Sequence, residues 1–157
     1  MHQDNEPFET LVVRRHRRKT LIAALWILLS VVIGALAASY AQAETVDGRR
    51  IVIVDGDTID VRGERIRILN IDAPESFRSR CEAELKLALR TKERLAQLLR
   101  AGPVMIEREG QDGYRRTLAR LSARGRDVGD TLVREGLALP WRGGREAKEV
   151  RLHSWCG

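Results

Sequence analysis

The stretch Val54–Glu75, VDGDTIDVRGERIRILNIDAPE, decides how the rest of the chain is interpreted. It brings carboxylates and guanidinium groups together between two short apolar runs: Asp55, Asp57, Asp60, Asp72 and Glu75 with Arg65 and Arg67. Charged groups are costly to bury unless they are paired, so this mixture does not suit a plain core. It favours a site that holds a cation and an anion at the same time.

The same stretch has the pattern of a β-meander. Arg50–Val54 and Thr58–Val61 are short β-rich runs that are separated by the turn dipeptide Asp55-Gly56. A hairpin turn at Arg62-Gly63-Glu64 leads into a third strand, Arg65 to about Ile71, which Ala73-Pro74 ends. Three consecutive strands joined by tight turns are therefore expected.

The period changes to a helical one over Glu82–Arg100, and Gly102-Pro103 ends that helix. The apolar residues at helical spacing, expected to form its buried stripe, are Leu85, Ala88, Leu89, Leu95, Ala96 and Leu99. Strands at Val104–Glu107 and Thr117–Leu121 follow, and then helices at Val128–Glu135, with Asp127 as N-cap, and at Glu146–His153. This order predicts a mainly β protein with helices (α+β). We expect a five-stranded barrel of the oligonucleotide-binding type, with one helix between strands 3 and 4; an open α+β sheet is the alternative.

The first 43 residues differ from the rest. Residues 1–20 are polar and end in a basic cluster that we expect to be cytoplasmic, and Leu21–Ser39 carries no charge over 19 residues, or roughly 28 Å of helix. Ala41-Gln42-Ala43 resembles a signal-peptidase site. Residues 21–43 therefore predict a signal peptide cleaved after Ala43 or an uncleaved membrane anchor. Either way, residues 44–157 are an exported domain, at the periplasmic face of the inner membrane, free in the periplasm, or secreted.

The excess of arginine indicates the class of partner, and the cysteine pair indicates a disulfide. The chain has a net charge of +6, and beyond residue 43 only Lys86, Lys92 and Lys148 are lysines, so the basic side chains are mostly arginine. Arginine suits phosphate oxygens, which indicates a polyanionic partner, although codon preference is an alternative explanation. Cys81 and Cys156 are the two cysteines, and an even pair in an exported domain indicates a disulfide.

The chemistry that these residues offer is that of a hard cation beside a phosphate. Asp57 and Asp72 can supply oxygen ligands to Ca²⁺ or Mg²⁺, and Glu75 can orient or deprotonate a water. Arg67 and Arg116 can grip a phosphodiester, and Tyr114 can contact a phosphate, base or sugar. Catalytic mechanisms that need a histidine are disfavoured, because the only histidines are His2, His16 and His153.

One geometric condition tests this interpretation. Arg67 and Asp72 are five residues apart, and in a straight strand an odd spacing places side chains on opposite faces. They can meet only if the strand ends or twists near Leu69-Asn70.

The motif DGDT at Asp55–Thr58, the run Arg67-x4-Asp72-Ala73-Pro74-Glu75 and the run Tyr114-x-Arg116-x-Leu118-Ala119 resemble the staphylococcal nuclease (thermonuclease) family. Leu132–Ala138 is similar to the family's helix after the fifth strand. The resemblance implies an oligonucleotide-binding barrel and Ca²⁺-dependent hydrolysis of phosphodiester bonds in DNA or RNA. It implies that Asp57, Asp72 and the Ala73 carbonyl ligate Ca²⁺, that Glu75 is the general base or positions the attacking water, and that Arg67 and Arg116 bind phosphate.

The chain departs from that family in places. Arg115 stands where the family usually has glycine before the second arginine, so Arg115 can also be the second phosphate-binding residue. The tail lacks the Tyr-x-Tyr pattern, and a Cys81–Cys156 bridge is expected to hold it to the barrel. The leading hypothesis is a monomeric metal-dependent nuclease whose partners are nucleic acid and, through residues 21–39 if uncleaved, the membrane. The alternatives are a non-cleaving nucleic-acid-binding module and an envelope protein with a structural calcium site.

Overall fold

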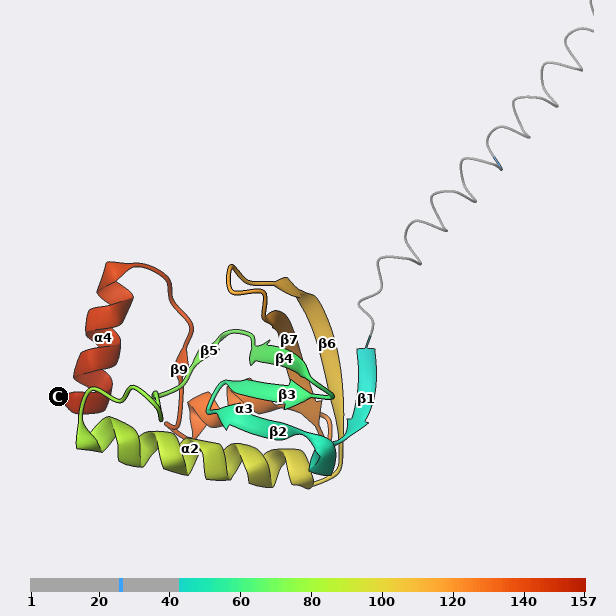
Figure 1. Cartoon of the computed structure of the whole chain (residues 1–157), viewed down its shortest axis with the longest axis horizontal. Coiled ribbons are helices and arrows are strands. Elements are labelled where there is room, and N and C mark those ends of the chain that lie inside the picture. Colours follow the sequence, from blue (N-terminus) through green and yellow to red (C-terminus); the bar gives the residue numbers. More distant parts are fainter. Residues whose placement is uncertain (1–25, 27–42) are drawn as a thin grey trace, which may run out of the picture. The chain divides into compact units, whose positions relative to one another are not determined.

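A curled sheet packed against helices makes up the computed structural model, which describes Trp26 and residues 43–157 (Figure 1). The sheet strands are β1 (Ala43–Asp47), β2 (Val52–Asp55), β3 (Thr58–Val61), β4 (Glu64–Ile68), β6 (Pro103–Gln111), β7 (Thr117–Ala123) and β8 (Arg126–Asp127). A separate pair is formed by β5 (Ile71–Asp72) and β9 (Leu139–Pro140). The helices are α2 (Glu82–Arg100), α3 (Val128–Arg134) and α4 (Arg145–Cys156), with a 3₁₀ turn η1 at Gly48–Arg50. The mixed α+β class expected from the sequence is confirmed.

The strand order explains the curl of the sheet. The order is β1-β6-β7-β4-β3-β2, in which β4 and β7 run parallel and the other neighbours run antiparallel. The two outermost strands, β1 and β2, are consecutive in the chain and are separated only by η1 and Ile51. A sheet whose two edges are joined by so short a connection must curl back toward itself, and it forms a half-barrel.

The inside of the curled sheet holds the core. In β7 the side chains alternate strictly, so that Thr117, Ala119, Leu121 and Ala123 are buried and the residues between them face the other side. The same alternation places Ile59 and Ile66 in the core, where α2 and α3 cover them. Arg116 comes directly before β7, at a position that continues the face opposite the core, and its side chain lines a surface site.

Helix α2 lies along one side of the sheet, and α4 stands beside its N-terminal end (Figure 1). The buried stripe of α2 consists of residues at helical spacing: Glu84, Ala88, Thr91, Leu95 and Leu99. The expectation that Leu89 shares this stripe is wrong, because Leu89 is 54% exposed. The stripe instead admits two polar side chains whose hydrogen bonds are satisfied inside the fold.

Two expectations for the chain path need correction. The third strand, expected over Arg65 to about Ile71, is divided into β4 and β5 by a turn, and β1 was not expected at all. The expected signal peptide or anchor, residues 21–43, falls almost wholly outside the described residues. Among the residues that are described, no helix is both long and apolar enough to cross a membrane.

Candidate active site

The DGDT turn is held close to the segment that carries Asp72. Gly56 lies in this turn between β2 and β3, and a Cβ atom placed on it would come within 2.7 Å of the Ala73 Cβ and 2.8 Å of the Thr91 Cγ2. A side chain would therefore push the turn away, and only glycine permits this approach. The close packing brings Asp57 beside Asp72 and Ala73, although 15 residues separate the two aspartates.

The strand break that Arg67 and Asp72 require is present. Leu69 and Asn70 form a turn between β4 and β5, and Asn70 adopts a left-handed backbone conformation with φ of 65°. Asparagine tolerates this conformation better than most residues. The Asn70 carbonyl accepts a hydrogen bond of 2.8 Å from the backbone N–H of Trp141, which attaches the turn to the C-terminal part of the chain.

Arg67 lies between the two aspartates. Its Nη1 donates a short hydrogen bond to Asp57 Oδ2, and its Nη2 lies 3.4 Å from Asp72 Oδ1 and 3.1 Å from the Ile71 carbonyl oxygen. Burial opposes its charge, but the Asp57 and Asp72 carboxylates outweigh this effect and raise the pKa of Arg67. The guanidinium is charged, mostly buried and fixed in position by three acceptors.

The carboxylates of Asp57 and Asp72 form an oxygen-only donor pair. Asp57 Oδ1 also accepts a 2.8 Å hydrogen bond from Thr58 Oγ1, and Asp72 Oδ2 lies 2.6 Å from Arg151 Nη1. Burial and the nearby Asp57 carboxylate raise the pKa of Asp72, against the influence of Arg151 and Arg67. Two adjacent carboxylates beside the buried Ala73, with no histidine or cysteine among the residues that line this site, fit a hard divalent cation rather than a soft one.

A second group of potential ligands was not singled out from the sequence. Among the described residues, Cys81, Glu84 and Cys156 form the one set of three whose donor atoms all lie within 4.8 Å of one another. The two sulfur atoms lie at disulfide distance, and a bond between them would leave neither available to a metal ion. Asp57, Asp72 and Glu75 do not form such a tight trio, and a cation there would need further oxygens from backbone or water.

Glu75 lies near Asp57 and Asp72, and its surroundings favour the protonated form of its carboxyl group. Burial, followed by the carboxylates of Asp55, Asp57, Asp72 and Glu84, raises its pKa. Its backbone N–H lies 3.5 Å from Oε1 of the fully buried Glu84. Glu84 is held in turn by Arg80, whose backbone and guanidinium donate to it at 2.7 to 3.1 Å. Glu84 thus fixes the loop that carries Glu75.

The two neighbouring arginines are placed differently. Arg116 lines the cleft and is held by Asp112, with Nε–Oδ2 and Nη2–Oδ2 distances of 2.8 and 2.7 Å. Arg115 is exposed, has a φ of 62° in the tight turn and does not line the cleft. Tyr114 is 84% exposed, and the Arg116 guanidinium lies 5.5 Å from its ring centre.

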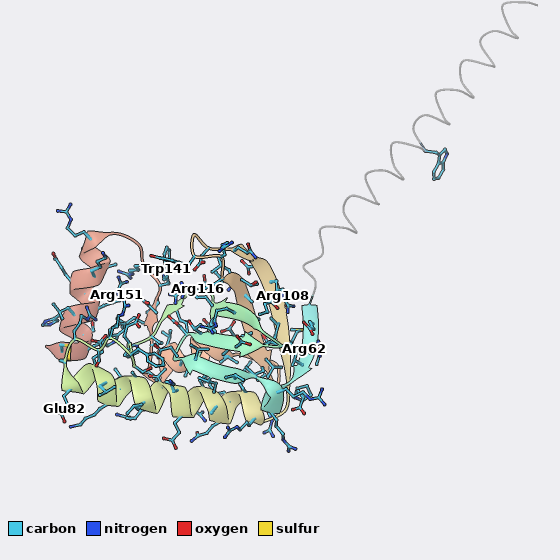
Figure 2. All side chains as sticks on the ribbon, viewed as in Figure 1. Arg62, Glu82, Arg108, Arg116, Trp141 and Arg151 are labelled. Atoms are coloured by element: carbon cyan, nitrogen blue, oxygen red, sulfur yellow. A yellow bond between two sulfur atoms is a disulfide. The ribbon has the colours of Figure 1, made fainter. Side chains whose placement is uncertain are left out.

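These groups surround one open cleft of about 860 Å³. One wall comes from the sheet and the β6–β7 loop, and the other from the C-terminal segment, as the positions of Arg116, Trp141 and Arg151 in Figure 2 show. The residues of the second wall are Trp141, Arg142, Gly143, Gly144, Lys148 and Arg151. The contribution of Arg142, Lys148 and Arg151 to the cleft was not predicted from the sequence, because no short motif marks these residues.

Comparisons with known proteins agree with the motifs. Residues 65–154 match the family described as "Staphylococcal nuclease homologue". The chain is 32% identical to the succinoglycan biosynthesis protein ExoI of Rhizobium meliloti (strain 1021), over 71% of this chain and 61% of that protein. It is 27% identical to an uncharacterized endonuclease of Haemophilus influenzae, over 80% of this chain and 66% of that protein. The chain thus spans slightly less than two thirds of each of these two relatives.

Proposed function

Because this chain belongs to the family of staphylococcal nuclease homologues, we propose that its cleft hydrolyses phosphodiester bonds of DNA or RNA with the help of a divalent cation, and that this ion is Ca²⁺. One relative is named an endonuclease, which supports nuclease activity in general. The observation that carries the proposal is the placement of Arg67 between Asp57 and Asp72, with Glu75 and Arg116 on the same cleft.

The site residues divide the work by their chemistry. Asp57, Asp72 and the backbone carbonyl of Ala73 would hold the cation. When bound, such an ion supplies positive charge to a phosphate oxygen and acidifies a nearby water. Arg67 and Arg116 donate to the non-bridging phosphate oxygens, and their hydrogen bonds strengthen as charge builds on those oxygens during attack.

Glu75 acts as the general base in this scheme. Its carboxylate accepts the proton of a water whose oxygen attacks phosphorus in line. The bond from phosphorus to the 5′-oxygen breaks, and the 5′-oxygen leaves with the bonding electron pair and takes a proton from solvent water. Burial, together with the carboxylates around Glu75, raises its pKa and so increases its affinity for that proton. Arg115 has no part in the scheme, because it does not border the cleft.

The remaining expectations belong to the same proposal. The half-barrel topology, with β4 and β7 parallel and the edges joined at η1, supports the five-stranded oligonucleotide-binding barrel expected from the sequence. We propose that the chain is a monomer and is exported by its first 43 residues, as a signal peptide or an anchor. Fusing residues 1–43 to a reporter that is active only outside the cytoplasm tests export.

The test of function uses the full chain under oxidising conditions, incubated with DNA and with RNA, in Ca²⁺ or in chelator. We expect cleavage only with Ca²⁺, and at least a hundredfold loss in Arg67→Ala. Because this variant leaves Asp57 and Asp72 without their shared partner, its rate is measured at a temperature at which circular dichroism shows it to be folded. Tight binding without cleavage would instead identify a non-cleaving nucleic-acid-binding module. Calcium binding with neither binding nor cleavage of nucleic acid would identify a structural calcium site.

A further inference from the structure

Both oxygens of the Asp72 carboxylate are paired with guanidinium groups. Oδ1 lies 3.4 Å from Arg67 Nη2, and Oδ2 lies 2.6 Å from Arg151 Nη1. Arg67 is shared with Asp57, whereas Arg151 reaches Asp72 from α4, which is 79 residues away in the chain. Each oxygen of this carboxylate already faces a guanidinium group, so a cation that binds Asp72 is repelled by Arg151 and competes with it for the carboxylate.

The position of Arg151 is fixed by the packing of α4. One helical turn beyond Arg151, the ring of Trp155 is buried, and the Arg80 guanidinium lies 5.6 Å from its centre. The next residue, Cys156, has its sulfur 2.00 Å from that of Cys81, and the Cys81 sulfur also caps the first turn of α2. These contacts hold α4 against α2, and they aim Arg151 at the cleft (Figure 2).

The charges on the cleft indicate what Arg151 binds after it leaves Asp72. The basic side chains that border the cleft are Arg65, Arg67, Arg116, Arg142, Lys148 and Arg151, and the acidic ones are Asp55, Asp57, Asp72, Glu75 and Asp112. The charged side chains of the second wall, which comes from the C-terminal segment, are all basic. If a cation takes the Asp57–Asp72 pair, that wall faces the substrate with its charge uncompensated, which suits phosphate.

We propose that Arg151 is a third phosphate-binding residue, which is paired with Asp72 in the free protein and transfers to a phosphate of the nucleic acid when the divalent cation binds Asp72. The proposal rests on the proposed function of the cleft. It also gives an order of binding, in which the cation binds before the nucleic acid. The reason is that the Arg151 guanidinium weakens cation binding in the free protein and strengthens substrate binding once the cation is bound.

This exchange predicts effects of opposite sign in one variant. Calorimetric titration of the full chain with CaCl₂, without nucleic acid, should show roughly tenfold tighter binding by Arg151→Ala, the size expected when one close competing charge is removed. The affinity for a single-stranded oligonucleotide at saturating Ca²⁺, measured in a Glu75→Gln background to prevent cleavage, should fall roughly tenfold. The slope of log Kd against log salt should decrease by about 0.7, the contribution of one phosphate contact on a single strand.

Two further variants separate charge from structure. Arg151→Lys keeps the positive charge and should recover most of the wild-type affinity for both ligands. Arg145→Ala removes an exposed arginine from the same helix, one that does not border the cleft, and should change neither affinity. Thermal unfolding of each variant checks that the fold is retained.

The outcomes distinguish the two proposals. Cleavage by the wild type, with Arg151→Ala unchanged in Ca²⁺ affinity or in oligonucleotide affinity, would overturn the role of Arg151 and leave the proposed function intact. A wild type that neither cleaves nor binds nucleic acid would overturn the proposed function and this inference with it. Opposite shifts in the two affinities support the exchange, because a merely structural role would not improve Ca²⁺ binding.

Discussion

Arg67 and Asp72 lie 3.4 Å apart, Nη2 to Oδ1, although a straight strand would place them on opposite faces. The turn at Leu69-Asn70 removes this separation, because it ends β4 and restarts the chain as β5. The arrangement of the candidate site therefore depends on a backbone conformation at one residue, Asn70, with φ of 65°.

Replacing Asn70 tests this dependence. Asn70→Val puts a β-branched side chain at positive φ, which costs about 1–3 kcal/mol, and should shift the turn and lower the nuclease rate at least tenfold. Asn70→Gly accepts the conformation and should retain most activity. The control is Arg62→Val, which imposes a similar backbone cost in the exposed hairpin turn, at φ of 54°. It should lower the melting temperature while the rate per folded molecule stays unchanged; an equal loss of rate in both valine variants would contradict the prediction.

Neighbouring arginines give a matched pair of variants. Arg116→Ala should reduce kcat/KM by about a hundredfold or more, because Arg116 borders the cleft and is oriented by Asp112. Arg115→Ala should stay within about threefold of the wild type, as expected for an exposed charge outside the cleft. Steady-state cleavage of one oligonucleotide at fixed ionic strength measures both. The reverse order would assign the phosphate-binding role to Arg115.

The cysteine pair should stabilise the domain and hold the second wall of the cleft. Closing a loop of 75 residues contributes about 4–5 kcal/mol on the chain-entropy model, so reduction should lower the melting temperature by about 10 °C or more. Because Cys156 ends α4, reduction should also weaken oligonucleotide binding in the wild type more than in Arg151→Ala. An unchanged melting temperature on reduction would show that Cys81 and Cys156 are not bonded in solution.

Glu84 links pH to stability. Burial opposes its ionisation, but the hydrogen bonds from Arg80 prevail and lower its pKa below the ordinary value of 4.5. A folded-state pKa below the unfolded one means that the contribution is present above about pH 4.5 and is lost as the pH falls through the folded value. Glu84→Gln should therefore cost roughly 1–3 kcal/mol at pH 7, and this difference should shrink below pH 4.5.

Urea unfolding of the wild type and Glu84→Gln between pH 3 and pH 7 measures that difference, with Glu82→Gln, an exposed residue of the same helix turn, as the control. A difference between wild type and Glu84→Gln that stays constant over the whole range would contradict the linkage. Since Glu84 also holds the backbone N–H of Glu75, the variant should lose nuclease rate at pH 7 even where it is fully folded.

Much of the local structure was predictable from the sequence. The strand Thr58–Val61 and the helix Glu82–Arg100 have the expected bounds, because period-2 and period-3.6 patterns and flanking turn residues are local signals. The placement of Glu84 in the core was not predictable in the same way. Its charge is acceptable there only because Arg80 lies within hydrogen-bonding distance, and a hydrophobicity pattern does not register such a partner.

The candidate site was likewise predictable only in part from the sequence. The sequence by itself determined the family, the types of residue that face the cleft from the sheet, and the need for a break near Asn70, since these follow from motif, chemistry and strand geometry. Only the tertiary structure decided that Arg116 rather than Arg115 borders the cleft, and that Arg151 reaches Asp72. The reason is physical: the approach of α4 to the Asp72 segment depends on the packing of Trp155 and the position of Cys156 against α2, contacts between segments about 75 residues apart that no local pattern encodes.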